Sequence, residues 1–173
     1  GMKTDAFVQC VMFALDEAGF KFSVLQRGRR GQTVALVVDD GSALLGLWTI
    51  LGTVAAWEPA VFGNGTEEQR VAEWLALVDE ELLPAGYIVA TYRDTGATHY
   101  VLRKLEALVL GPYVAGETFT LADVVAAPLM QRFFEIGLVK PKRYPRLHAW
   151  WGALQGRASF ARTKPAPGCG EWW

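Results

Sequence analysis

Apolar positions at the start of the chain predict one helix followed by β-strands. The helix is predicted over residues 6–18, because apolar side chains recur there at intervals of three and four and Gly19 follows as a stop. Two β-like runs come next, at residues 20–25 and 33–38. The basic loop between them, residues 26–32, is too short for a helix.

A hairpin is predicted after the second of these runs. Asp39-Asp40-Gly41-Ser42 has the composition of a tight turn, and the apolar run behind it predicts a third strand at residues 43–45. The uncharged residues that follow predict a helix that ends at about Trp57. We therefore expect a sheet of three strands, or of four with a very short first strand.

From Pro59 onward the periodicity is helical. A capping box of Thr66 and Gln69 predicts the start of an amphipathic helix, and Pro84-Ala85-Gly86 predicts its end. A further helix is predicted over residues 97–110, where apolar side chains again share one face.

The most apolar helix is predicted over residues 121–137. Thr120 and Asp123 form its capping box, and because apolar side chains occur on nearly all of its sides we expect it to be buried all round. Pro145 is typical of a first helical turn and predicts the start of the last helix. The tail from Thr163 is rich in Pro and Gly and is expected to be loose.

These elements predict a chain in two parts, the first α+β and the second all-α. Residues 2–57 are expected to form a small α/β unit, residues 58–163 a helical domain and residues 164–173 a loose tail. The uncharged stretch at residues 41–57 is too short, and too interrupted by Gly and Thr, to span a bilayer. No membrane association is therefore expected.

Composition changes this picture little. Apolar residues make up 51% of the chain and charged residues 20%, as in a globular protein, and the formal net charge is −1. No overall field draws the chain to nucleic acid, so direct nucleic-acid contact is not expected. Arg27, Arg29 and Arg30 form a basic loop whose side chains are either solvated or touch RNA or an acidic partner.

Candidate chemistry is sparse. Cys10 and Cys169 do not make a disulfide framework and are expected to be reduced, as in the cytoplasm. His99 and His148 have no Cys or Asp partners at ligand spacing, so no metal site is predicted. Without a phosphate loop, a dinucleotide fingerprint or a nucleophile elbow, we predict no cofactor and no catalytic residue.

Segments of both halves resemble the glutathione-transferase superfamily. Residues 113–124, Tyr-Val-Ala-Gly-Glu-Thr-Phe-Thr-Leu-Ala-Asp-Val, are similar to the family's Y-L-A-G-x-x-F-T-L-A-D-I stretch, whose Thr and Asp cap a buried central helix. Residues 144–150 are similar to its Y-P-x-L-x-x-W segment, and residues 11–19 and 34–41 resemble its first helix and third strand. The resemblance implies a truncated thioredoxin-like N-terminal unit joined to an all-helical glutathione-transferase C-terminal domain.

The first half departs from this family at the residues that hold glutathione. No Tyr, Ser or Cys falls in register before the first helix, where residues 4–7 are Thr-Asp-Ala-Phe. Ala35 stands where the family has a cis-proline, and Gly46 and Leu47 stand where it has a Glu and a Ser. Against the resemblance, these losses imply that the chain does not bind glutathione, because the charges of the tripeptide would be left unpaired.

Shortened domains of this kind resemble those associated with aminoacyl-tRNA synthetases and the gamma subunit of a translation elongation factor. That resemblance implies a cytoplasmic, non-catalytic protein–protein interaction module that scaffolds such an assembly. Its partner would be a second copy or another transferase-like domain of a synthetase or elongation factor. The alternative is an active glutathione transferase that conjugates glutathione to electrophiles, and a third interpretation is a dimeric structural domain without a link to translation.

Two helix faces carry the candidate interface residues, which are aromatic or basic: Trp48, Trp57, Arg143, Arg146, Trp150 and Trp151. Trp150 and Trp151 are adjacent on one helix and point about 100° apart. Either one faces the core while the other anchors a partner, or both are half-buried.

Overall fold

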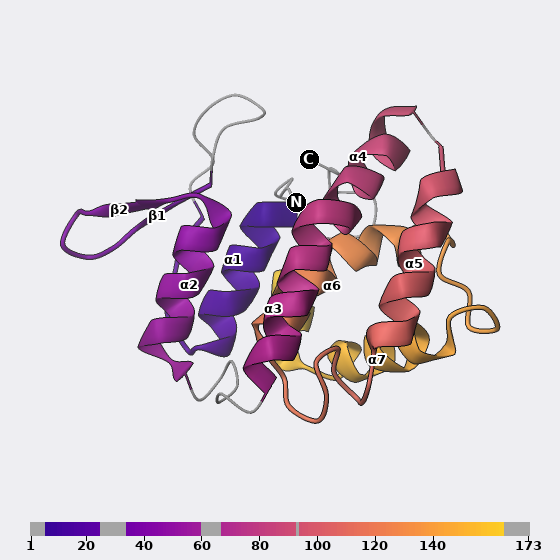
Figure 1. Cartoon of the computed structure of the whole chain (residues 1–173). Coiled ribbons are helices and arrows are strands. Elements are labelled where there is room, and N and C mark those ends of the chain that lie inside the picture. The colour runs from indigo at the N-terminus through magenta and orange to yellow at the C-terminus, as the bar shows by residue number, and fades with distance from the viewer. Residues whose placement is uncertain (1–5, 25–33, 60–66, 93, 165–173) are drawn as a thin grey trace.

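The computed structural model describes residues 6–24, 34–59, 67–92 and 94–164 (Figure 1). In chain order its elements are α1 (Ala6–Glu17), β1 (Ala35–Val37), β2 (Ala43–Leu45), α2 (Leu47–Trp57), α3 (Glu68–Leu77), η3 (Val78–Leu82), α4 (Leu83–Tyr92), α5 (Gly96–Leu108), α6 (Leu121–Glu135), α7 (Pro145–Gln155) and α8 (Ala158–Thr163). A small α/β part is thus followed by a helical part, as predicted. None of the described helices is long and apolar enough to cross a bilayer.

β1 and β2 form the predicted hairpin, which projects from the body beside α2 (Figure 1). The strands are antiparallel, with Leu36 opposite Leu44. Gly41 has a φ of 83°, which a residue with a Cβ rarely adopts, and the Asp40 carboxylate accepts the backbone N–H of Ser42 at 2.8 Å. The turn is therefore stabilised by residues 40–42 themselves, through the positive φ of the glycine and the hydrogen bond from the serine to the aspartate.

The sheet has two strands in the described residues, so the prediction of three or four strands is wrong there. Residues 20–24 of the predicted strand at 20–25 form no strand. Gly19 ends α1 with a φ of 75°, and the Phe20 ring then packs edge-on against Trp57 of α2, with 5.6 Å between ring centroids. This contact holds the segment on α2. The predicted short first strand and the loop at residues 26–32 lie outside the described residues.

Residues 68–92 form one continuous helical run, so the predicted helix end at Pro84 is wrong. α3 passes into the π-turn η3, in which the N–H of Leu83 donates to the carbonyl of Val78, five residues earlier. Pro84, which has no N–H to donate, is the second residue of α4, directly after this wider turn. The chain accommodates this proline by widening one turn instead of ending the helix.

The start of α3 also differs from the prediction. Thr66 lies outside the described residues, the N-cap residue is Glu67, and the Gln69 amide donates to Glu73 at 3.0 Å. Glu67 instead accepts the backbone N–H of Glu117 at 3.2 Å, which ties α3 to the loop before α6. Because Thr66 is not among the described residues, the capping box of Thr66 and Gln69 stays a prediction.

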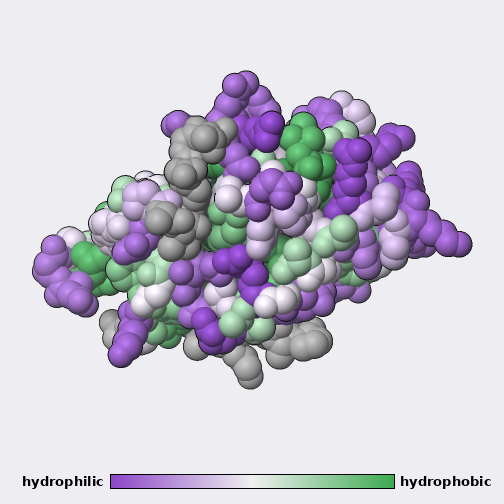
Figure 2. Space-filling view, turned by 90° about the horizontal axis from the view of Figure 1, so that it is seen from below, coloured by the Kyte–Doolittle hydropathy of each residue, from purple (hydrophilic) through white to green (hydrophobic). Residues whose placement is uncertain are grey.

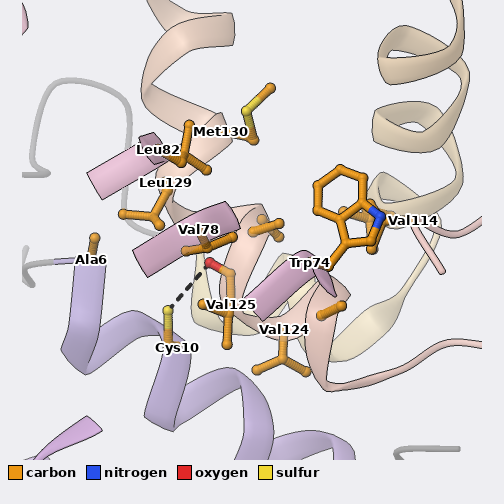
Figure 3. Close-up of a cluster of buried hydrophobic side chains, with 14 of the residues drawn as sticks. Ala6, Cys10, Trp74, Val78, Leu82, Val114, Val124, Val125, Leu129 and Met130 are labelled. Carbon is orange, nitrogen blue, oxygen red and sulfur yellow. Dashed lines mark hydrogen bonds between the residues drawn. The ribbon is translucent and has the colours of Figure 1, made fainter. Parts of the chain in front are cut away.

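α6 is the central helix, and its predicted burial is confirmed, since every residue from Ala122 to Phe133 is buried. Figure 3 shows how α1, the α3–η3 run and α6 share one core, with Cys10, Trp74 and Val125 among its side chains. The Cys10 thiol donates to the carbonyl of Val125 at 3.7 Å. The two parts of the chain are therefore packed through α1 and α6.

The last helices complete the domain. Residues 97–110 correspond to α5, and Pro145 opens α7 at its first position, as predicted. α8 was not predicted, and it packs against both α1 and α7. Residues 165–173 of the predicted tail lie outside the described residues, and the division of the chain at residue 57 stays a prediction.

Candidate functional site

The junction between β2 and α2 contains Gly46 and Leu47, which stand where the resembled family has a Glu and a Ser that hold glutathione. Gly46 has a φ of 88° and donates its N–H to the carbonyl of Val34 at 2.9 Å. Leu47 begins α2 with a buried side chain, and no side chain caps the helix. A glutamate at position 46 would be strained in this backbone conformation. The junction therefore offers a turn of backbone and an apolar side chain, without a carboxylate or hydroxyl at these two positions.

The other two predicted losses are placed less fully. Ala35 is exposed at the start of β1, and every peptide bond in the described residues is trans. Residues 4 and 5 lie outside the described part, so the position of the predicted missing hydroxyl or thiol stays a prediction. Of the three departures, the structure thus places two, Ala35 on the hairpin and Gly46-Leu47 at the junction of β2 and α2.

Several large apolar side chains are exposed beside this junction. Trp48 and Trp57 of α2 are 39% and 44% exposed, and Val37 and Leu45 are exposed on the outer face of the hairpin. Figure 2 shows hydrophobic and hydrophilic side chains mixed at the hairpin end of the molecule. Trp48 and Trp57 thus have the exposure that an interface role requires, and their contact with a partner stays a prediction.

Trp150 and Trp151 are both buried, at 0% and 6% exposure. Neither alternative from the sequence, one tryptophan free to anchor a partner or both half-buried, is therefore correct. The Trp151 ring stacks on Phe134 at 4.5 Å between centroids and meets Phe160 of α8 edge-on at 5.2 Å. The physical reason is α8, a helix that was not predicted from the sequence and that covers Trp151 of α7 with Phe160. Both tryptophans belong to the core.

Arg143 and Arg146, the other predicted interface residues, are exposed. The Arg143 guanidinium lies over the Tyr144 ring, 5.5 Å from its centroid. The backbone N–H of Arg146 donates to the Glu106 carboxylate at 2.9 Å, which leaves the Arg146 side chain outside that contact.

The predicted capping box of Thr120 and Asp123 is confirmed. The Asp123 carboxylate accepts the N–H of Val114 at 3.0 Å, the N–H of Thr120 at 2.9 Å, the Thr120 hydroxyl at 3.2 Å and the Trp150 indole N–H at 2.8 Å. Burial raises the pKa of Asp123 to about 6, although each of these hydrogen bonds lowers it. A carboxylate enclosed by four donors and fully buried holds the fold together and is closed to a substrate.

A second polar cluster, around Glu17, was missed by the sequence. Arg157 donates to both Glu17 oxygens, at 2.9 and 2.6 Å, and to the Tyr113 hydroxyl at 2.9 Å. The Ser159 hydroxyl also donates to Glu17. Burial raises the pKa of Glu17, but the hydrogen bonds from Arg157 and Ser159 outweigh it and hold that pKa below its usual range. These residues are far apart in the sequence, so no local spacing could have revealed the pairing.

Two further polar contacts join helices in the described part of the chain. Gln9 of α1 donates to Gln131 of α6 at 3.0 Å in the buried contact between the two parts. The ring of His99 lies 3.0 Å, Nδ1 to oxygen, from the Tyr144 hydroxyl. Within the residues that the structure describes, no group of three His, Cys, Asp or Glu side chains could hold a metal ion.

Comparisons with known proteins identify the fold. The family model described as "Glutathione S-transferase, C-terminal domain" matches residues 93–157, which contain the Asp123 cap. Glutathione S-transferase A of Pleuronectes platessa is 40% identical over 55 residues, which are 32% of this chain and 24% of the relative. The chain thus aligns with about a quarter of that curated relative.

Solved structures extend the likeness to the whole chain. Glutathione transferase Omega 2S of Trametes versicolor, in complex with 2,4-dihydroxybenzophenone, has a TM-score of 0.78 at 18% identity, over 96% of this chain and 90% of that one. The theta-class glutathione S-transferase of Xanthomonas axonopodis pv. citri, with glutathione bound, has a TM-score of 0.75 at 20% identity, over 94% and 93%. This chain therefore has the glutathione-transferase fold, with a shortened thioredoxin-like part and a helical C-terminal domain.

Proposed function

We propose that this chain uses the glutathione-transferase fold to bind another protein and does not conjugate glutathione. The observation that carries this proposal is the junction of β2 and α2, where Gly46 and Leu47 provide neither a carboxylate nor a hydroxyl. A charged tripeptide in a site without these partners would lose water contacts and gain no equivalent ones.

The surface that we assign to this function lies beside the junction. Trp48 and Trp57 are large, rigid and exposed, and aromatic side chains of this kind are enriched among the residues that dominate binding energy. The sequence resemblance to synthetase-associated and elongation-factor domains supplies the partner class in this proposal. The partner is a transferase-like domain of such an assembly or a second copy of this chain.

Conjugation of glutathione is the second candidate function, and the comparisons favour it. The curated relative is called a glutathione S-transferase, and one similar structure has glutathione bound. The backbone could also donate hydrogen bonds to a carboxylate of glutathione, because no side chain caps the N-terminus of α2 and its first N–H groups point out of the helix.

Light scattering and a conjugation assay on the same preparation separate the two candidates. We expect the wild-type chain to exceed its monomer mass, alone or mixed with a transferase-like synthetase domain, and the variant Trp48→Ala/Trp57→Ala to lose that association. The matched control is Tyr87→Ala/Tyr92→Ala, which removes two exposed aromatics from α4 and should leave the mass unchanged. A strict monomer that transfers glutathione to a chlorodinitrobenzene would instead establish the second candidate.

A further inference from the structure

A cluster of five exposed basic residues lies where α5 meets the loop between α6 and α7. Its members are Arg103 of α5, Lys140, Lys142 and Arg143 of the loop, and Arg146 of α7. We call it the basic surface. It lies at the end of the molecule opposite the hairpin, where hydrophilic side chains gather in Figure 2. In the part of the chain that the structure describes, none of the five forms an ion pair.

The backbone that carries four of these cations is firmly held. Val139 and Tyr144 are buried on either side of the loop, and the carbonyl of Lys140 accepts the N–H groups of Arg143 and Tyr144 at 3.0 and 2.9 Å. The Tyr144 hydroxyl contacts His99 of α5. The cations are therefore presented on a fixed turn, which lowers the entropy lost when they bind a ligand.

The positive charge is concentrated enough to act on its neighbours. Burial lowers the pKa of His99, and the charges of Arg143, Arg103 and Lys140 lower it further. The two oxygens of the nearby Glu106 carboxylate accept the backbone N–H groups of Arg146 and Leu147, both at 2.9 Å, and among the described residues Glu106 forms no ion pair with the five cations.

We propose that the basic surface binds the phosphodiester backbone of a nucleic acid. Phosphates need only well-placed cations, and Arg forks match their geometry. Residues 139–147 expose no large apolar side chain that could anchor a protein partner, and the exposed aromatic of α5, Tyr100, has the Lys104 ammonium over its ring, 4.7 Å from the centroid. A receptor that recognises basic peptides would need residues 140–146 in an extended conformation. These residues instead form a turn and the start of α7. The formal net charge of −1 describes the whole chain and does not reveal this local group of cations. The proposal does not depend on the function proposed above.

Fluorescence anisotropy with a labelled RNA strand and a DNA strand of about 20 nucleotides tests the proposal, at salt concentrations from about 50 to 200 mM. Five phosphate contacts should give a slope of log affinity against log salt of about −3 to −4. Arg143→Gln/Arg146→Gln should reduce that slope by about 1.5 and weaken binding roughly tenfold at the lowest salt. The control Lys21→Gln/Lys164→Gln, with the same change of charge away from this loop, should bind like the wild type.

Binding of either nucleic acid with this pattern supports the proposal, and a preference between RNA and DNA identifies the source of the phosphates. No binding of either strand at about 50 mM salt, where phosphate contacts are strongest, would overturn the proposal. An equal loss of affinity in the control variant would also overturn it, as would binding of poly-glutamate as tight as that of the nucleic acids. All substituted side chains are at least partly exposed, and matched melting temperatures will verify that the variants fold.

Discussion

Asp123→Ala should lower the free energy of unfolding by about 2–4 kcal/mol. The substitution leaves the N–H groups of Val114 and Thr120 and the indole N–H of Trp150 buried without an acceptor. It also removes the cap from α6, the most buried helix. Urea denaturation followed by tryptophan fluorescence and by circular dichroism would measure the change.

Asp79→Ala is the matched control, because Asp79 is exposed on η3. It should change stability by less than about 0.5 kcal/mol. An Asp123→Ala variant as stable as this control would mean that Asp123 does not hold the start of α6.

Arg157→Ala should lower stability by about 2–3 kcal/mol. The Glu17 side chain is only 9% exposed and would lose both hydrogen bonds from the guanidinium. The Phe119 ring would also lose a guanidinium that lies 3.9 Å from its centroid. Because Glu17 is on α1 and Arg157 precedes α8, the loss should loosen the contact between the two parts of the chain.

Arg162→Ala provides the comparison, since Arg162 makes a similar ion pair with Asp16 but is 61% exposed. Exposed pairs contribute little, so this variant should lose less than about 1 kcal/mol. A double-mutant cycle of Glu17→Gln and Arg157→Ala isolates the coupling. Equal losses for Arg157→Ala and Arg162→Ala would contradict the claim that burial makes the first pair important.

The elements that the sequence predicted correctly are those whose signals are local. The turn at Gly41, the cap at Asp123 and the first residue of α7 at Pro145 each depend on residues within four positions. Burial of α6 on all sides also followed from its own pattern. Such features depend on residues that are close in the sequence, so they can be predicted without knowing which distant segments pack together.

The errors came from contacts between distant segments. Pro84 predicted a helix end, but packing of the α3–α4 run against α6 and α5 keeps the helix going through a π-turn. Full burial of both Trp150 and Trp151 was not predicted, because α8, which covers Trp151 with Phe160, has only six residues and no strong pattern. The Glu17–Arg157 pair could not be predicted, since neither residue has a local signal for the other.

The candidate site divides in the same way. Trp48 and Trp57 could be chosen from the sequence because the local pattern predicted the helix that carries them, and the structure shows both exposed. Most of the basic surface is also local in the sequence, and Arg143 and Arg146 were chosen from it, but Arg103 joins residues 140–146 only when α5 packs beside α7.

Calorimetric titration of glutathione into the whole chain tests most directly the claim that the fold has lost its glutathione site. The theta-class enzyme of Xanthomonas axonopodis pv. citri, whose structure has glutathione bound, serves as the positive control. We predict no saturable heat for this chain, and no rise in its melting temperature in about 10 mM glutathione. Saturable binding with a Kd of about 0.1 mM, which at that concentration would stabilise the fold by about 2.7 kcal/mol, would contradict the account.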